Sequence, residues 1–104
     1  MANSSFNKVL DAVTTTTNSA SINWMGGVGS IAAAGTWDSA TVKLQVSPDD
    51  GTTWLDVGSA STLSDDGCAN FEFPPCDLRL VLTVTGTSSI TAWITEPYFP
   101  NSFR

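Results

Sequence analysis

Clustered carboxylates are the first groups in this sequence that could do chemistry. The triplet Asp-Asp-Gly occurs twice, at residues 49–51 and 65–67, and calcium favours clusters of carboxylate oxygens. The spacing differs from that of an EF-hand loop, where acidic ligands alternate and a glutamate closes the loop. Asp and Gly are also typical of tight turns, because both tolerate a positive φ and Asp bonds to nearby backbone. We interpret both copies as turns, with a cation shared between neighbouring subunits as the alternative.

A pair of catalytic carboxylates is the second possibility. Glycoside hydrolysis needs two carboxylates facing each other across a substrate groove. The chain has two glutamates, Glu72 and Glu96, and the sequence identifies a partner for neither. The chain also contains no histidine, which removes the imidazole base and the commonest transition-metal ligand. We therefore predict a protein that is not an enzyme, with no catalytic residue, no metal and no cofactor.

Residues 47–54, Ser-Pro-Asp-Asp-Gly-Thr-Thr-Trp, match the Asp-box pattern Ser-x-Asp-x-Gly-x-Thr-Trp at every defined position. This pattern resembles the hairpin motif that is repeated in sialidases and other propellers. The resemblance implies a structural turn, in which Ser47 and Asp49 hold the chain at Gly51 while Trp54 packs beneath it. One box cannot make a propeller, which has several four-stranded blades. A sialidase also needs an arginine triad, and this chain has two arginines, Arg79 and Arg104.

The composition excludes several classes of partner. The 104 residues suffice for one domain, and 10 acidic against 4 basic residues give a net charge of −6. Nucleic-acid binding depends on Lys and Arg contacts to phosphate, so we predict no nucleic-acid partner. No stretch approaches the roughly 18–20 apolar residues of a membrane-spanning helix, so we predict no membrane partner. The first residues lack the basic and apolar regions of a secretory signal, so we expect synthesis in a cytoplasm.

Alternation of apolar and polar residues predicts the strands that position these groups. Within residues 41–47, Val42, Leu44 and Val46 share one face, whereas Lys43 and Ser47 lie on the other. The same alternation gives inward-facing side chains in two later segments, with Leu78, Leu80, Leu82 and Val84 in residues 77–85 and Ile90, Ala92 and Ile94 in residues 89–96. Residues 86–88 would join these two segments as a short hairpin loop.

Further strands are predicted at residues 6–14, 20–25, 28–37, 54–58 and 68–73. Seven to nine short antiparallel strands bounded by turn residues indicate an all-β sandwich of the jelly-roll or Ig-like type. We divide the chain into an N-terminal arm (1–5), a β-sandwich domain (6–96) and a C-terminal tail rich in aromatics and proline (97–104).

Apolar side chains outside the predicted core indicate contacts with other proteins. Trp93 lies opposite the inward face of its strand, and Val81 on the strand predicted to be adjacent points the same way. The tail adds Tyr98, Phe99 and Phe103, which we expect to dock on a neighbouring subunit, with docking on the same sandwich as the alternative. A row of exposed tryptophans, drawn from Trp24, Trp37, Trp54 and Trp93, would instead favour stacking against sugars.

Two cysteines, Cys68 and Cys76, remain. The strand predicted between them covers about 16 Å at about 3.3 Å per residue, whereas a disulfide needs Cα atoms within about 7 Å. Closure would require Pro74-Pro75 to turn the chain straight back. We favour two reduced, buried thiols, with a disulfide as the alternative.

The motifs together are similar to those of a known class of protein. Residues 10–14, the Gly26-Gly27 turn, residues 34–45 (Ala-Gly-Thr-Trp-Asp-Ser-Ala-Thr-Val-Lys-Leu-Gln), the Asp box and Leu78-Arg79-Leu80 follow one another along residues 6–96. This pattern resembles the small β-sandwich virion proteins of tailed bacteriophages.

The resemblance implies a non-enzymatic head decoration (cement) protein on the outer surface of the capsid. Its partners would be the major capsid protein and copies of itself, arranged as a homotrimer. Head-fibre, tail and connector components are alternatives within the same class. A carbohydrate-binding host-attachment module is the alternative from another class.

Overall fold

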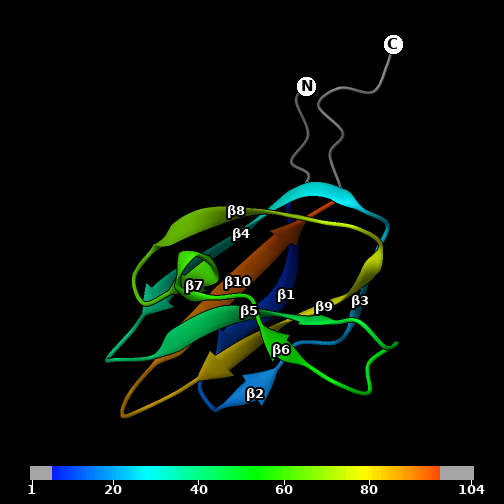
Figure 1. Ribbon diagram of the computed structural model, residues 1–104. Helices are drawn as coiled ribbons and strands as arrows, with labels where there is room; N and C mark the ends of the chain where they lie inside the picture. The colour runs from blue at the N-terminus through cyan, green and yellow to red at the C-terminus, as the bar shows by residue number, and fades with distance from the viewer. Residues whose placement is uncertain (1–5, 97–104) are drawn as a thin grey trace, which may run out of the picture.

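The computed structural model describes residues 6–96, which form two antiparallel β-sheets packed face to face (Figure 1). These residues contain ten strands and one 3₁₀ turn, η1 (Ser59–Ser61). The strands are β1 (Phe6–Val13), β2 (Thr17–Asn18), β3 (Ile22–Trp24), β4 (Gly27–Thr36), β5 (Thr41–Ser47), β6 (Leu55–Asp56), β7 (Thr62–Leu63), β8 (Gly67–Phe73), β9 (Cys76–Thr83) and β10 (Ser89–Thr95). The predicted all-β, antiparallel fold is confirmed. The count exceeds nine because the two-residue strands β2 and β7 are too short for a periodic signal.

The order of the strands is that of a jelly roll. One sheet has the order β1-β10-β4-β8, and the other has the order β2-β9-β5-β6, with β3 also on β9 and β7 also on β5. If β2 and β3 are counted as one interrupted strand, and β6 and β7 as another, the sandwich has eight strands. The first then pairs with the last, the second with the seventh, the third with the sixth and the fourth with the fifth. This nested pairing separates the jelly roll from the Ig-like alternative.

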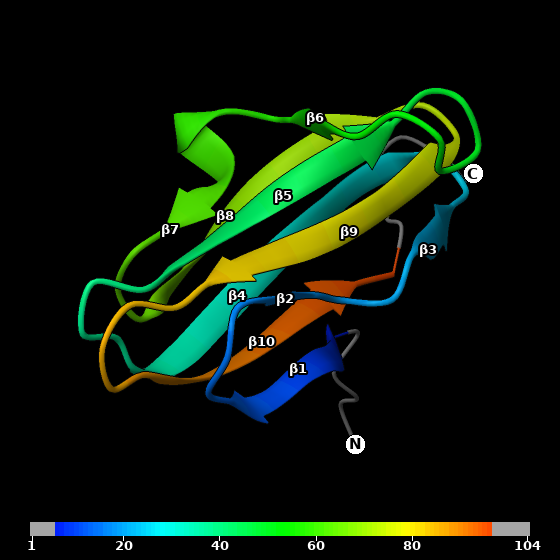
Figure 2. The same cartoon turned by 90° about the horizontal axis from the view of Figure 1, so that it is seen from below.

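The core lies between the two sheets, whose strands run nearly aligned when seen from below (Figure 2). The periodic segments bury the side chains that their alternation predicts. Val42 and Leu44 of β5, Leu78, Leu80 and Leu82 of β9, and Ile90, Ala92 and Ile94 of β10 are all buried. They join Trp24, Ile31 and Phe71 in one continuous hydrophobic cluster. Val46 and Val84, at strand ends, are only partly buried and pack against its margin.

The predicted hairpin at residues 86–88 is wrong. These residues connect β9, in the six-stranded sheet, to β10, in the four-stranded sheet, and the two strands do not pair. Alternation identifies the buried face of each strand, and both buried faces meet the same core from opposite sides. A loop that crosses the sandwich satisfies that pattern as well as a hairpin does. Val81 and Trp93 therefore lie on opposite outer faces of the molecule rather than on one patch.

Residues 6–13 form a strand, as predicted for residues 6–14, and it is an irregular strand at the edge of its sheet. The register of β1 against β10 shifts between Lys8 and Leu10 and again between Leu10 and Val13. Ala12 takes a positive φ of 49°, and its N–H donates to Thr91 Oγ1. Such bulges twist an edge strand and disfavour pairing with a further chain.

Gly29 of β4 is the buried glycine with the least room for a side chain. A Cβ atom added there would lie 2.5 Å from Trp24 Cη2 and 2.7 Å from Phe71 Cζ. The Trp24 and Phe71 ring centroids are 5.0 Å apart, so the two rings fill the space that a side chain at residue 29 would need.

We predict that Gly29→Ala destabilises the fold by about 1–3 kcal/mol, because the added methyl must displace two buried rings. Gly67→Ala is the matched control, since a Cβ at Gly67 in β8 would meet only the Asp65 carbonyl oxygen, at 3.9 Å. Chemical denaturation of both variants measures the free energy of unfolding. Equal stabilities would contradict this account of the packing.

Candidate binding surfaces

The Asp-box segment forms a hydrogen-bonded turn between β5 and β6. Ser47 Oγ accepts from the Gly51 N–H at 2.7 Å and donates to Asp49 Oδ1 at 3.0 Å. Asp49 Oδ1 also accepts from the Thr53 N–H at 2.7 Å, and hydrogen bonds from Thr53 are the main cause that lowers the pKa of Asp49. The indole Nε1 of Trp54 donates to the Gly51 carbonyl at 3.1 Å and so closes the turn from its other end.

Two details explain why the turn needs these residue types. Asp50 and Gly51 have φ values of 60° and 89°, a conformation that Asp and Gly tolerate better than most residues. Ser47, predicted to face solvent, is instead 1% exposed. The prediction failed because the chain bends directly after β5 and lays the turn over the Ser47 hydroxyl, which then binds the turn's backbone.

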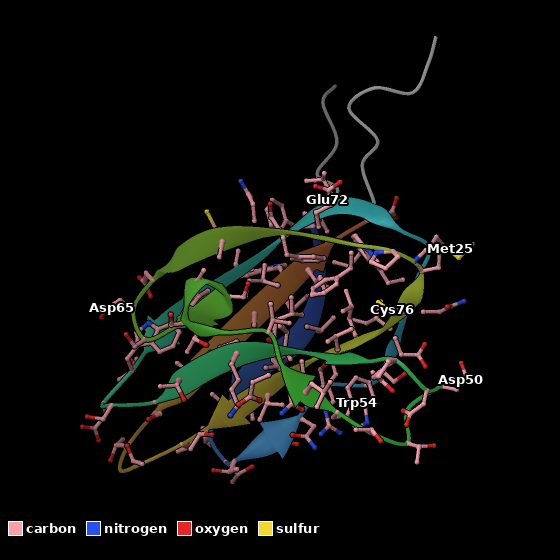
Figure 3. The ribbon with its side chains drawn as sticks, in the orientation of Figure 1. Met25, Asp50, Trp54, Asp65, Glu72 and Cys76 are labelled. Atoms are coloured by element: carbon pink, nitrogen blue, oxygen red, sulfur yellow. The ribbon has the colours of Figure 1, made fainter. Side chains whose placement is uncertain are left out.

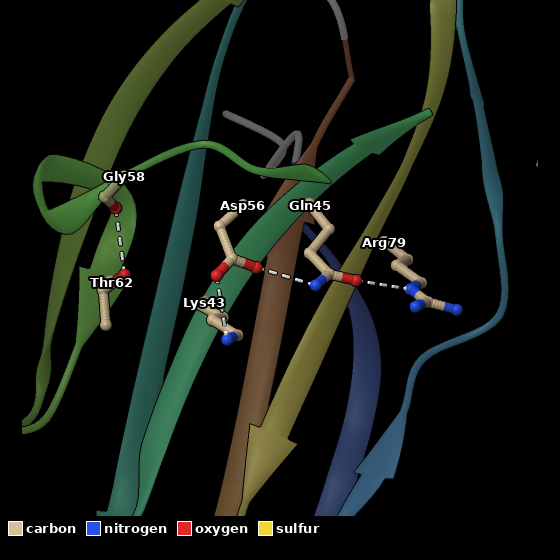
Figure 4. A network of polar contacts seen from close by, with 6 residues as sticks. All are labelled: Lys43, Gln45, Asp56, Gly58, Thr62 and Arg79. Carbon is tan, nitrogen blue, oxygen red and sulfur yellow. Dashed lines mark hydrogen bonds and ion pairs between the residues drawn. The ribbon is translucent and has the colours of Figure 1, made fainter. Parts of the chain in front are cut away.

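A chain of polar contacts extends from this turn across the outer face of the six-stranded sheet (Figure 4). The Arg79 guanidinium carbon lies 4.3 Å from the Trp54 ring centroid, and Arg79 Nε donates to Gln45 Oε1 at 2.9 Å. Gln45 Nε2 donates to Asp56 Oδ1 at 2.7 Å. Asp56 Oδ2 accepts from Lys43 Nζ at 3.1 Å, completing the chain.

This chain joins β5, β6 and β9 and leaves its charged groups engaged with one another. Hydrogen bonds from Gln45 and Lys43 lower the pKa of Asp56. An arginine stacked on an indole contributes about 0.5–1 kcal/mol when partly exposed. The arrangement braces one outer face, with its carboxylate held as an acceptor rather than placed to exchange protons with a substrate.

Alternation places Lys43 on the outward face of its strand, but it does not predict this chain of contacts. Gln45 is the register partner of both Arg79 and Asp56. Those cross-strand pairs depend on which strands are neighbours, and alternation within one strand does not determine that.

The second Asp-Asp-Gly triplet differs from the first. Asp65 and Asp66 lie in the bend between β7 and β8, as the turn interpretation expects, but neither they nor Gly67 has the positive φ that this interpretation invoked. Asp66 Oδ1 instead accepts from Trp37 Nε1 at 2.7 Å and from the Gly35 N–H at 3.0 Å. These bonds tie the β7–β8 loop to the β4–β5 loop. Asp65 and Asp50 project from opposite ends of the molecule, so the triplets cannot share a cation within one chain (Figure 3).

The β9–β10 loop joins the same end of the sandwich. The Thr87 N–H donates to Asp38 Oδ2 at 2.6 Å, and Ser88 Oγ donates to the Trp37 carbonyl at 2.8 Å. Three connections that cross between the sheets are thus held together by side chains. The result is a rigid end to the sandwich.

The two cysteines are free thiols in different sheets, Cys68 in β8 and Cys76 at the start of β9. Cys76 is partly buried, and burial is the main cause that raises its pKa. Cys68 is exposed, so the expectation that both thiols are buried is wrong for this residue. Its side chain points outward because its neighbour Ala69 faces the core.

The four tryptophans do not form a row. Trp24 is 1% exposed within the core, and Trp37 is tied to Asp66 at the loop end. Trp54 lies under the Asp-box turn, whereas Trp93 is partly exposed on the outer face of the other sheet. Among the proposed partner contacts, Val81 and Trp93 occupy opposite faces. Tyr98, Phe99 and Phe103 lie outside the described residues.

Within residues 6–96, no three or more Cys, Asp or Glu side chains come together as a metal-binding group. Nor does that part of the chain contain a helix with the length and apolar character needed to span a bilayer. Comparison with protein-family models, curated proteins and solved structures found no match to the chain.

We predict that Ser47→Ala destabilises the protein by about 1–2 kcal/mol, because it leaves the Gly51 N–H without its partner. Ser64→Ala is the control, since Ser64 is an exposed loop serine without a hydrogen bond among the described residues. Thermal unfolding should rank the Ser47 variant below both the control and the wild type. A Ser47 variant that melts with the control would contradict the role given to this hydroxyl.

A further prediction concerns the effect of Asp66 on the stability of the fold in acid. The Trp37 hydrogen bond is the main cause that lowers the pKa of Asp66 below 3.8, with the Gly35 N–H contributing next. A carboxyl whose pKa is lower in the folded state stabilises the fold above its unfolded pKa, and that stabilisation is lost as the pH falls through the folded pKa. Asp66→Asn should therefore be less stable than wild type at neutral pH, with the difference shrinking below pH 3.8.

Urea denaturation at a series of pH values measures this difference. Asp65→Asn is the matched control, because its exposed side chain has no hydrogen bond or ion pair within the described residues. A stability gap between wild type and Asp66→Asn that stays constant with pH would show that the Trp37 contact does not depend on the charge.

Proposed function

We propose that this protein is a non-enzymatic bacteriophage capsid decoration (cement) protein that binds the outer head surface and bridges major capsid subunits. The observation that carries the proposal is the nested jelly-roll pairing of the strands. Jelly rolls build viral capsid and lectin domains. Because a fold alone does not give a function, the surfaces must support the choice between them.

The two outer faces support a bridging role. The proposal needs a surface for the capsid and a surface for other copies, and the two predicted contact residues, Val81 and Trp93, lie on opposite faces of the sandwich, one for each. The sheets between them share one continuous hydrophobic core, and hydrogen bonds join the loops at one end. A body of this kind transmits force between its faces with little internal movement.

The positions of the tryptophans disfavour the lectin alternative. A platform for stacking sugars needs several aromatic rings on one surface, and here Trp24 is in the core while Trp54 and Trp93 are on different faces. The carboxylates of Asp49, Asp56 and Asp66 are acceptors in structural hydrogen bonds. These structural roles of the carboxylates favour a structural protein over a hydrolase.

The mechanism that follows is mechanical. Each copy would contact adjacent capsid subunits and resist the outward pressure of packaged DNA. Many copies on one shell make modest affinity per contact sufficient, because binding at several sites multiplies. The negative net charge of −6 suits a position on the outside of the shell, away from DNA.

We predict that the purified protein binds heads that lack it at on the order of hundreds of copies per particle, as the avidity argument requires. Deleting residues 97–104, which carry Tyr98, Phe99 and Phe103, should reduce that occupancy. Quantitative mass spectrometry of purified particles measures both numbers.

A chain with Ser64→Ala serves as the control for handling and expression. A copy number of about six to twelve would identify a tail or connector component instead, since such parts follow the low symmetry of the tail. Unchanged occupancy after the deletion would contradict the role given to the C-terminal tail.

A further inference from the structure

The outer face of the four-stranded sheet differs in character from that of the six-stranded sheet. Its two central strands, β4 and β10, contain no charged residue. The central strands of the six-stranded sheet, β5 and β9, carry Lys43, Asp77 and Arg79. Covering the first face therefore removes no ionised group of its central strands from water, whereas covering the second would.

The register aligns large and small side chains in rows across this face. Trp93 of β10 pairs with Ala32 of β4, and Ala32 pairs with Cys68 of β8. On the far side, Trp93 pairs with Lys8 of β1. The Trp93 indole thus lies beside the much smaller Ala32, and Trp93 is partly exposed.

The outward side chains of β4 form a row of small residues on the same face, which we call the trough. Those on either side of Ala32 are Ser30 and Ala34, because Ile31 and Ala33 between them are buried. The outward side chains of β10 are larger, with Thr91 and Thr95 flanking Trp93. The sheet therefore presents a row of larger side chains on β10, which we call the ridge, next to the row of small side chains on β4.

We propose that this face is a self-association surface on which a second copy of the chain packs about a twofold axis parallel to the strands, between β4 and β10. That operation lays β10 of one copy over β4 of the other. Trp93 of each copy then enters the trough above Ala32 of its partner, in two equivalent contacts. The match of ridge to trough under this rotation is what selects a second copy as the occupant.

The rim of the face fits the same arrangement. The rotation places Lys8, on the edge strand β1, over Cys68, an uncharged residue in β8 of the other copy. Lys8 keeps its neighbour Asp11, whose Oδ1 lies 3.7 Å from Lys8 Nζ, and both side chains stay at the edge in contact with water. Glu72, the charged residue of β8, lies four positions from Cys68 on the side away from Asp11 of the other copy, so these two carboxylates are not brought together.

The size of the face limits the strength of the contact. Four strands at about 4.8 Å and about seven residues at about 3.3 Å give a footprint of about 400 Å² per copy. Stable interfaces bury about 800 Å² per partner, so this dimer is weak in dilute solution. It would fill only at high local concentration, as on a crowded particle surface.

The inference deepens the proposed function, on which it rests for its biological setting, by naming the face through which copies meet. A twofold contact makes a dimer, in place of the homotrimer expected from the sequence. Its test uses the free full-length chain without capsids. Failure here would leave attachment to heads untouched, and failure to bind heads would leave self-association untouched.

Sedimentation equilibrium over about 10 µM to about 1 mM tests the inference. The weight-average mass of the wild type should rise from 10.9 kDa toward twice that value. Ala32→Lys fills the trough with a charged chain and should stay at the monomer mass throughout. Thr83→Lys adds the same charge at an exposed position of β9, on the opposite face, and should associate like the wild type.

Trp93→Ser removes the ridge without adding volume and should weaken association at least about tenfold, which keeps the test informative if Ala32→Lys does not fold. Thermal melting checks the fold of each variant. A wild type that stays monomeric, a mass that rises toward three copies, or an Ala32→Lys variant that associates normally would each overturn the proposal. So would a chain ending at residue 96 that associates when the full chain does not, because residues 97–104 would then be the occupant.

Discussion

The structure depends on one constraint, which is that β9 and β10, consecutive in the sequence, bury their apolar faces in the same core from opposite sheets. β9 contributes Leu78, Leu80 and Leu82 from one side, and β10 contributes Ile90, Ala92 and Ile94 from the other. The loop between them crosses the sandwich instead of closing a hairpin. The outward residues of β9 and β10 therefore lie on opposite surfaces, so the molecule has two separate outer faces.

Those faces are stabilised by different means. On the six-stranded sheet, an Asp-box turn, an arginine stacked on Trp54 and the Gln45–Asp56–Lys43 chain hold three strands together. On the four-stranded sheet, small and hydroxyl-bearing residues surround Trp93, and the central strands carry no charge. Ionised groups that are paired with one another lose much when covered, whereas hydroxyl and methyl groups lose little. This difference supports the proposal that copies associate through the four-stranded sheet.

Three aspartates of this chain have structural roles. Asp49 holds the Asp-box turn, Asp56 accepts from Gln45 and Lys43, and Asp66 joins two loops. In each case, hydrogen bonds lower the pKa of the carboxyl, so the charged form is the one that the fold uses. This bracing of the sandwich supports the proposal that the protein reinforces a larger shell.

The sequence by itself determined the fold class, the inward faces of β5, β9 and β10, and the Asp-box residues, because alternation and turn chemistry act over a few neighbouring residues. Only the tertiary structure decided which sheet each strand joins. It therefore also decided that Val81 and Trp93 face apart, that Ser47 is buried, and that Asp66 binds Trp37. The alternation of apolar and polar residues shows which side of a strand is apolar. It does not show which other strand lies beside that strand.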